Sequence, residues 1–386
     1  MTPITDSKTL AALCERLAGA DFVTVDTEFV RDTTYWPRLC LVQLAGPEDA
    51  AIVDPLAEGI DLAPLLRLLN DEPVVKVFHA ARQDLEIFFH MTGKVPSPVF
   101  DTQVAAMVCG FGDQVSYEKL ANSLAGARID KGARYADWQR RPLTERQLEY
   151  ALSDVTYLRK AYSKLARKLE KNGRADWLNE EMAVLTDPET YDLAPERAWL
   201  RLKTRSRDRR YLTVLRALAT WREEEAQRRD LPRNRVLRDE QLFDIAQRAP
   251  QSVKELAHTR GLNEDFARGR LGKGILAAIE GALALPQDQW PSLPKGGAQV
   301  DAPGPITDLL KMLLKVKCDN EGVAPKLVAN SQEIERLAAG EDEDSPLLHG
   351  WRYDVFGRDA EALMAGRLAI AARNGKAVAL PLDGGD

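Results

Sequence analysis

The chain has 386 residues, and none of its apolar runs approaches the length of roughly 18 residues that a membrane-spanning helix needs. Its first ten residues, MTPITDSKTL, lack the basic and then apolar layout of a secretory signal peptide. We therefore expect neither export nor insertion into a membrane, and we predict that the protein acts in the cytoplasm.

Cysteine is scarce, and its spacing excludes two kinds of site. Cys14, Cys40, Cys109 and Cys318 are separated by 26, 69 and 209 residues, so the chain has no C-x-x-C pair. A zinc ribbon or a redox couple would need such a pair. We expect four reduced thiols, as is usual in the cytoplasm.

An excess of basic residues is also missing from the chain as a whole, which has a net charge of −6. The charge is unevenly distributed, however. Residues 197–238 contain 14 Lys or Arg and five Asp or Glu, whereas residues 301–386 contain 10 basic and 15 acidic residues. The middle of the chain therefore predicts an electropositive face that could bind a polyanion.

The first 190 residues mix strand and helix patterns, which predicts a sheet with helices packed on it. Residues 21–30 alternate apolar and polar side chains, as a half-buried strand does. Two runs separated by a short turn, 39–44 and 51–54, indicate an antiparallel hairpin. Further strand and helix patterns cover 61–70 (helix), 74–78 (strand), 80–90 (helix) and 144–171 (helix, with Thr144 as N-cap).

The rest of the chain is almost wholly helical in pattern. Residues 286–305 hold five prolines and three glycines and indicate a linker between two such regions. Beyond this linker we predict helices over 306–316 and 360–372.

Five side chains in this pattern have the chemistry of a metal-dependent active site. Asp26 and Glu28 lie two apart on the first strand and so share one face. Asp84 begins a helix, and Tyr150 and Asp154 are four apart on the long helix. Each alone has an ordinary structural explanation, such as a surface acid pair, a first-turn Asp that favours the helix dipole, or a core Tyr beside a solvated Asp.

Together, in this order and spacing, they resemble the DEDD exonucleases of the tyrosine-bearing subclass. The segments DTEFVRDTTYWPRLCLVQLA, HAARQD and ADWQRRPLTERQLEYALSDVTYL are similar to ribonuclease D. The segment RALATWREEEAQRRDLPRNRVLRDEQL resembles the HRDC module, a helical nucleic-acid-binding domain, and PLLHGWRYDVFG resembles the end of ribonuclease D chains. One departure is Ser153, where the family pattern leads us to expect Ala.

The resemblance implies the fold class. We expect an α/β ribonuclease-H-like 3′–5′ exonuclease domain, with a mixed central sheet flanked by helices, over residues 1–195. Two small all-α HRDC-type domains should follow, an HRDC domain over 196–286 and a second HRDC-like C-terminal domain over 305–386, joined by a linker over 287–304.

The resemblance also implies the chemistry. Converging carboxylates need a compensating cation, and oxygen-only ligands favour Mg²⁺ or Mn²⁺ over zinc. We expect two divalent metal ions held by Asp26, Glu28, Asp84 and Asp154, with Tyr150 orienting the attacking water. Nucleoside 5′-monophosphates would leave one at a time from a 3′ end.

We predict three groups of RNA-binding side chains. Aromatic rings close to the first strand could stack on terminal bases, and basic side chains could contact phosphates near the cleft and on the helical region. These residues are Phe29 and Trp36; Lys131, Arg134, Arg140 and Arg141; and Lys203, Arg205, Arg209, Arg210, Arg233 and Arg235. Core packing is an equal alternative for Phe29, and a solvated, acid-paired surface is the alternative for the basic residues.

The main functional prediction is a 3′ to 5′ exoribonuclease that trims structured RNA, with tRNA precursors as the substrate that the resemblance implies. We predict no membrane partner and no obligate protein partner. Two alternatives stay open: a DNA 3′–5′ exonuclease of the proofreading or helicase-associated type, and a catalytically silent nucleic-acid-binding scaffold. The presence of all four acids and of Tyr150 disfavours the scaffold.

Overall fold

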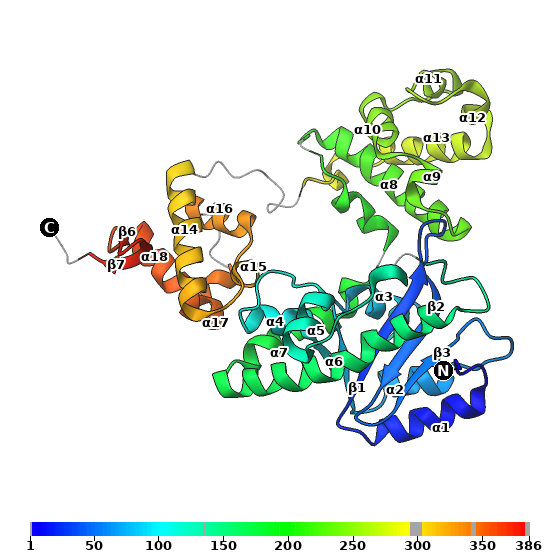
Figure 1. Ribbon diagram of the computed structural model, residues 1–386. Coiled ribbons are helices and arrows are strands. Elements are labelled where there is room, and N and C mark those ends of the chain that lie inside the picture. Colours follow the sequence, from blue (N-terminus) through cyan, green and yellow to red (C-terminus); the bar gives the residue numbers. More distant parts are fainter. Residues whose placement is uncertain are drawn as a thin grey trace. The chain divides into compact units, whose positions relative to one another are not determined.

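A computed structural model of the chain describes residues 2–133, 136–192, 194–204, 206–293, 303–340 and 345–382, without the side chain of Lys131 (Figure 1). The chain divides into two compact units, and we describe each by itself. The first comprises Met1–Glu28, Leu39–Thr190 and Val300–Asp386, and the second comprises Phe29–Arg38 and Tyr191–Gln299. In the parts that are described, every helix is too short or too polar to span a bilayer.

A mixed five-stranded sheet forms the centre of the first unit, in the order β3-β2-β1-β4-β5. β1 pairs parallel with β4, and β4 pairs parallel with β5, whereas β2 and β3 form the predicted antiparallel hairpin. The strands are β1 (Phe22–Val30), β2 (Arg38–Ala45), β3 (Ala50–Val53), β4 (Val75–Phe78) and β5 (Val99–Asp101). The sheet confirms the predicted mixed architecture.

Helices cover the sheet, and β2 is buried along its whole length after Arg38. A strand that is apolar on both faces has to be covered on both faces, since either one would otherwise expose apolar surface to water. The helices of this region are α1 (Ser7–Ala18), α2 (Ala63–Asn70), α3 (Arg82–Thr92), α4 (Thr102–Val108), α5 (Tyr117–Ala125), α6 (Glu145–Asn172) and α7 (Ala175–Thr186), with short 3₁₀ turns η1 (Lys131–Ala133) and η2 (Pro188–Thr190).

The long helix α6 begins and ends as its sequence predicts. Thr144 is the N-cap, and with Gln147 it forms a capping box in which each side chain bonds the other residue's backbone amide. Gly173 ends the helix in the left-handed conformation. The buried residues of α6 recur every three or four positions and include Ala151, Val155 and Leu158, so one face of the helix packs on the sheet.

The second unit has a helical core, as predicted for residues 196–286. Leucine and isoleucine side chains of its two long helices pack together, for example Leu215, Leu218 and Ile279, which are fully buried. The helices are η3 (Pro195–Arg201), α8 (Arg209–Arg229), α9 (Arg233–Val236), α10 (Asp239–Arg248), α11 (Val253–Ala257), α12 (Glu264–Arg268), α13 (Arg270–Leu283) and η4 (Gln287–Gln289).

The segment Phe29–Arg38, which continues from β1, packs within this second unit. The backbone amides of Tyr35 and Trp36 both donate to Oδ1 of Asp230 at 3.0 Å. The Tyr35 hydroxyl donates to the buried carboxylate of Glu223, and the guanidinium of Arg233 lies 4.8 Å from the Tyr35 ring centroid. Position in the sequence therefore does not decide which unit a residue belongs to.

The C-terminal region is mostly helical, but it ends in a two-stranded hairpin, so the prediction of a wholly α-helical domain is wrong in this detail. The predicted helix over 360–372 stops at Met364. Asn374 and Gly375 have positive φ angles of 52° and 74°, which is the turn that joins two antiparallel strands. The elements are α14 (Gly304–Glu321), α15 (Pro325–Val328), α16 (Ser331–Ala339), η5 (Pro346–Leu348), α17 (Gly350–Arg352), a π-helical turn η6 (Tyr353–Gly357), α18 (Arg358–Met364), β6 (Leu368–Arg373) and β7 (Lys376–Pro381). Half of the predicted linker, residues 294–302, lies outside the described residues.

The C-terminal region packs on α4 and α7 within the first unit. The rings of Trp177 and Trp351 stack with centroids 4.5 Å apart, and the guanidinium of Arg352 pairs with Glu181. The backbone amide of Ala324 donates to the carbonyl oxygen of Met107 at 3.0 Å. Gly110, at the end of α4, lies so close to Gly322 that a Cβ atom there would be 2.4 Å from the Gly322 carbonyl oxygen.

We predict that Gly110→Ala destabilises the protein much more than Gly93→Ala. Both glycines are left-handed, with φ angles of +78° and +72°, but nothing lies within 4 Å of a Cβ atom built on Gly93. We expect a cost of about 1 kcal/mol for Gly93→Ala and roughly 2 to 5 kcal/mol for Gly110→Ala, measured by urea unfolding. Equal costs would show that the backbone at Gly322 does not pack tightly on the end of α4.

Candidate active site

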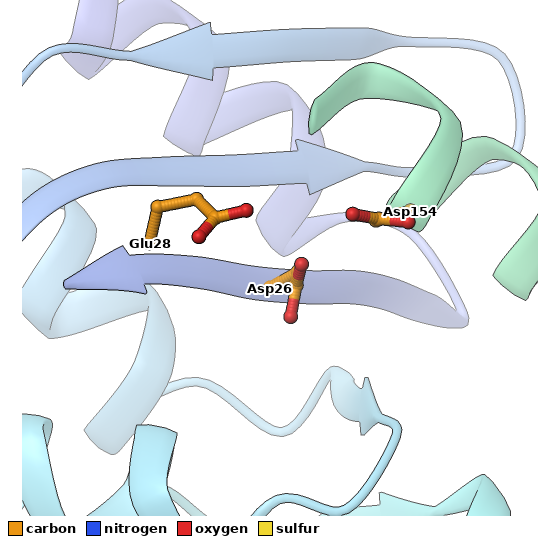
Figure 2. A group of neighbouring side chains, drawn as sticks. All are labelled: Asp26, Glu28 and Asp154. Atoms are coloured by element: carbon orange, nitrogen blue, oxygen red, sulfur yellow. The ribbon is translucent and has the colours of Figure 1, made fainter. Parts of the chain in front are cut away.

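Three of the predicted carboxylates meet at one point. Asp26 and Glu28 extend from the same face of β1, and Asp154 approaches them from α6 (Figure 2). One oxygen of each group lies within 4.8 Å of an oxygen of the other two. Residues separated by more than 120 positions are therefore close enough to share one ion.

Asp84 lies beside this group. It is in the first turn of α3 and is 7% exposed. The hydroxyl of Thr27, between the two acids of β1, donates to Oδ1 of Asp84. This hydrogen bond fixes Asp84 next to β1, close enough for its charge to raise the pKa of Asp26.

Asp101 holds the loop that leads to Asp84, and the sequence analysis did not identify it. Its carboxylate accepts hydrogen bonds from the backbone amides of Ala80, Ala81 and Gln103 at 3.0, 2.8 and 2.7 Å. Ala80 has a φ of +60°, a conformation that a side-chain-bearing residue adopts only when its surroundings hold it. The sequence signal that could have identified Asp101 is its position directly before the start of a helix, where N-cap residues are common.

Tyr150 and Asp154 lie on the same face of α6, as predicted. The carbonyl oxygen of Ser153 accepts a hydrogen bond from the Tyr117 hydroxyl at 2.9 Å, and the Ser153 hydroxyl bonds the carbonyl oxygen of Tyr150 at 2.7 Å. The departure at Ser153 is therefore accommodated within the helix. The Thr24 hydroxyl, 2.9 Å from the carbonyl oxygen of Val155, joins α6 to β1.

The four carboxyl groups have raised pKa values, as expected for acids that are buried close together without a compensating cation. Burial, followed by the charges of Asp154, Asp84 and Glu28, raises the pKa of Asp26 well above its usual range. Burial and the charges of Asp154 and Asp84 raise the pKa of Glu28 to about 9. Burial raises the pKa of Asp84 and that of Asp154 to about 7, opposed by hydrogen bonds from Thr27 and Tyr150 respectively.

These donors fit a hard divalent cation. All are carboxylate oxygens, which suit Mg²⁺ or Mn²⁺, whereas zinc sites usually include Cys or His. A divalent ion would also offset the repulsion that, together with burial, raises the pKa values of Asp26 and Glu28. Because three oxygens lie within reach of one ion and a fourth carboxylate is adjacent, the residues present can hold divalent metal.

The group opens into a cleft of about 570 Å³, which Asp26, Asp154 and Tyr150 line together with Tyr117 and His79. Tyr117 was not identified from the sequence. The two ring nitrogens of His79 lie 3.0 Å from the Thr102 hydroxyl and 3.1 Å from the carbonyl oxygen of Val115. His79 therefore has a structural, hydrogen-bonding role.

The structure does not describe every residue predicted to contact RNA. Arg134, Arg205 and the side chain of Lys131 lie outside the described residues. Phe29 is half-buried, and Arg140 is exposed. Trp36 packs against a buried cluster of Tyr35, Ala226 and Val236, so we revise its prediction from base stacking to packing.

Several of the predicted arginines already have partners. Arg141 forms a two-point ion pair with Asp54 at 2.6 and 2.7 Å, and Arg233 is paired with the buried Glu223. These ion pairs join separate segments of the chain, which favours structural roles for both arginines. Arg209 donates to backbone carbonyl oxygens, including that of Gln287 at 2.9 Å.

The chain matches two family models and long stretches of known proteins. A 3′-5′ exonuclease model matches residues 1–170, and an HRDC domain model matches residues 212–279. Ribonuclease D of Granulibacter bethesdensis is 50% identical over 380 residues, covering 98% of this chain and 96% of that protein. Ribonuclease D of Gluconacetobacter diazotrophicus is 52% identical over 368 residues, covering 95% and 93%.

Among solved structures, the chain resembles that of Escherichia coli RNase D, described as an exoribonuclease involved in structured RNA processing. The two share 33% sequence identity with a TM-score of 0.81, over 95% of this chain and 99% of that one. A protein from Bifidobacterium adolescentis, 22% identical with a TM-score of 0.67, supports the fold alone.

We predict that the metal-free protein loses stability as the pH rises. The cluster carboxyls have raised pKa values in the folded state, so they stabilise it below about pH 4 and lose that contribution as the pH rises through about 7 to 9. Asp26→Asn should flatten this slope and, at pH 8, raise the free energy of unfolding by about 1 to 3 kcal/mol.

The measurement is urea unfolding in EDTA between pH 5 and pH 9. Asp71→Asn is the control, because Asp71 is exposed and pairs with Lys94. Parallel pH slopes in wild type and Asp26→Asn would rule out a repelling cluster at this site.

Proposed function

The chain belongs to the ribonuclease D family and is a 3′ to 5′ exoribonuclease, and from this premise we propose that it hydrolyses RNA at the carboxylate group described above. The residues that carry out the reaction are Asp26, Glu28, Asp84, Tyr150 and Asp154. The observation that supports this most strongly is the convergence of Asp26, Glu28 and Asp154 within 4.8 Å of one another beside an open cleft.

Each carboxylate has a distinct task in the proposed site. Asp26, Glu28 and Asp154 would together hold a first divalent ion, Mg²⁺ or Mn²⁺, and Asp26 and Asp84 would help to hold a second, with Asp84 acting directly or through water. When bound, such ions activate a water and stabilise the leaving 3′ oxygen. Tyr150, which lines the cleft, orients the attacking water.

We propose that the products are nucleoside 5′-monophosphates and that the substrates are structured RNAs, with tRNA precursors among them. Escherichia coli RNase D, which resembles this chain over nearly its full length, is described as acting in structured RNA processing. The cytoplasmic location and the three domain boundaries stay predictions.

The helical unit offers two exposed basic groups for RNA. Lys203, Arg210 and Arg235 are exposed, and among the described residues none of them has an acidic partner. Phosphate contacts at such residues add affinity without reading sequence.

The second group was not identified from the sequence. Arg228, Arg229 and Arg270 surround the single carboxylate of Glu225, with Arg228 at 2.9 Å and Arg229 at 3.6 Å. One acid cannot neutralise three guanidinium groups, so an excess positive charge remains at a surface hollow of about 470 Å³ that all three arginines line. We include these arginines in the proposed RNA-binding surface.

We predict that Asp26→Asn and Asp154→Asn abolish turnover while RNA binding is kept. The rate should fall by more than the roughly 10²- to 10³-fold that loss of one stabilising hydrogen bond costs, because the ions lose a ligand. The assay uses 5′-labelled RNA and DNA oligonucleotides of the same sequence with Mg²⁺, Mn²⁺ or EDTA, and Asp71→Asn is the control.

Wild type should give a single-nucleotide ladder on RNA and no products in EDTA. A ladder on DNA alone would favour the DNA exonuclease alternative. Turnover by Asp26→Asn at the wild-type rate would refute the assignment of the site.

We also predict that the helical unit sets the salt dependence of RNA binding. Each lost phosphate contact should reduce the slope of log K against log salt by about 0.7. We would combine Arg210→Gln and Arg235→Gln in one double variant, and Arg229→Gln and Arg270→Gln in another. The slope of each would be compared with that of the wild type by titrating a single-stranded RNA at several salt concentrations.

Arg268→Gln is the matched control for Arg270, because Arg268 lies two residues away and has Glu264 as its own partner. Cleavage of a short oligonucleotide should be unchanged in all variants. If neither pair of substitutions changes the slope, the RNA contacts lie elsewhere.

A further inference from the structure

The segment before α6 is held by one guanidinium group. Arg141 Nε and Nη2 donate to the two carboxylate oxygens of Asp54 at 2.6 and 2.7 Å, and Nη2 also donates to the carbonyl oxygen of Cys40 at 2.8 Å. Nη1 donates to the carbonyl oxygens of Trp138 and Arg140 at 2.7 and 3.0 Å. All five N–H donors of an arginine are therefore satisfied.

These acceptors connect the segment to the sheet. Cys40 lies on β2, and Asp54 directly follows β3. β2 is the neighbour of β1, the strand that bears Asp26 and Glu28. Arg141 thus fixes the backbone at Trp138 relative to the same sheet that positions the catalytic acids.

Trp138 in turn lies against Tyr150. Its side chain is 3% exposed, and its ring centroid is 6.2 Å from that of Tyr150 at an interplanar angle of 33°. Aromatic rings at this distance are in contact and favour a tilted arrangement. The Trp138 ring therefore occupies space into which the Tyr150 ring would otherwise turn.

Tyr150 needs such support because it borders an open cleft. Its ring is part of the cleft wall, and its hydroxyl hydrogen-bonds Asp154. A tyrosine that orients a water has to hold its hydroxyl within a few tenths of an ångström, and residues behind it provide that precision.

We propose that Trp138 and Arg141 are positioning residues that hold Tyr150 in place for catalysis. The inference rests on the proposed function, in which Tyr150 orients the attacking water. Neither residue touches the reacting atoms: Arg141 fixes the backbone of Trp138, and the Trp138 ring fixes Tyr150.

A double-mutant cycle on the full-length chain tests this coupling. Trp138→Phe and Arg141→Lys are each combined with Tyr150→Phe, and single-turnover rates and apparent RNA affinity are measured with Mg²⁺. Each single substitution at position 138 or 141 should slow the wild-type reaction about tenfold, the lower end of the effect of removing a supporting partner, with less than a twofold change in affinity. In the Tyr150→Phe background, which lacks the hydroxyl, the same substitutions should slow the reaction less than twofold.

A merely structural role would give a different result. Partial unfolding lowers the active fraction by the same factor in both backgrounds, so equal slowing would overturn the proposal. Trp351→Phe is the matched control, because Trp351 is also buried, at 5% exposure, and its indole nitrogen, like that of Trp138, has no hydrogen-bond partner among the residues that the structure describes. We expect the control to retain the wild-type rate.

Two further outcomes are distinguishable from these. If Trp138→Phe does not fold, as judged by circular dichroism, Arg141→Lys carries the test, because it keeps the charge and leaves the Trp138 side chain unchanged. If Tyr150→Phe alone has the wild-type rate, the role proposed for Tyr150 fails, and the positioning role fails with it. If Tyr150→Phe is slow but the effects are additive, only the positioning role fails.

Discussion

Mutual repulsion between buried carboxylates is the constraint on which the rest of the nuclease region depends. Asp26, Glu28 and Asp154 share one point, and burial together with the charges of Asp154 and Asp84 raises the pKa values of Asp26 and Glu28. Burying such charge costs several kcal/mol per ion unless it is compensated. The protein therefore has to hold these side chains together in a rigid frame until divalent ions neutralise them.

The frame consists of hydrogen bonds made by neutral or remote groups. Thr27 fixes Asp84, Asp101 fixes the loop before α3, and Thr24 joins β1 to α6. Thr27 and Thr24 are neutral, whereas the negative charge of Asp101 helps to raise the pKa of Asp84. The buried polar residues around the site therefore orient the acids. The bound cations would supply the compensating charge.

The arginines show how the same residue type acquires opposite roles. Arg141 and Arg233 are committed to Asp54 and Glu223, where the fixed geometry of a guanidinium joins separate segments. Arg228, Arg229 and Arg270 crowd one carboxylate and retain excess positive charge at the surface. A count of basic residues along the sequence cannot separate these cases, since the difference lies in which acids fold up against them.

The sequence by itself determined many of the local elements and pointed to the acids that we propose as catalytic. Strand alternation over 21–30, the capping box at Thr144 and the order of Asp26, Glu28, Asp84, Tyr150 and Asp154 are local patterns, and the Asn374–Gly375 turn was a local signal that the helix prediction overlooked. Only the tertiary structure decided that Phe29–Arg38 packs with the helical unit and that Ala324 and Trp351 contact α4 and α7. It also decided that Arg141 pairs with Asp54 and that Trp36 packs against Tyr35. The reason is physical: local patterns follow from backbone geometry within a few residues, whereas pairing and packing depend on side chains that only folding brings together.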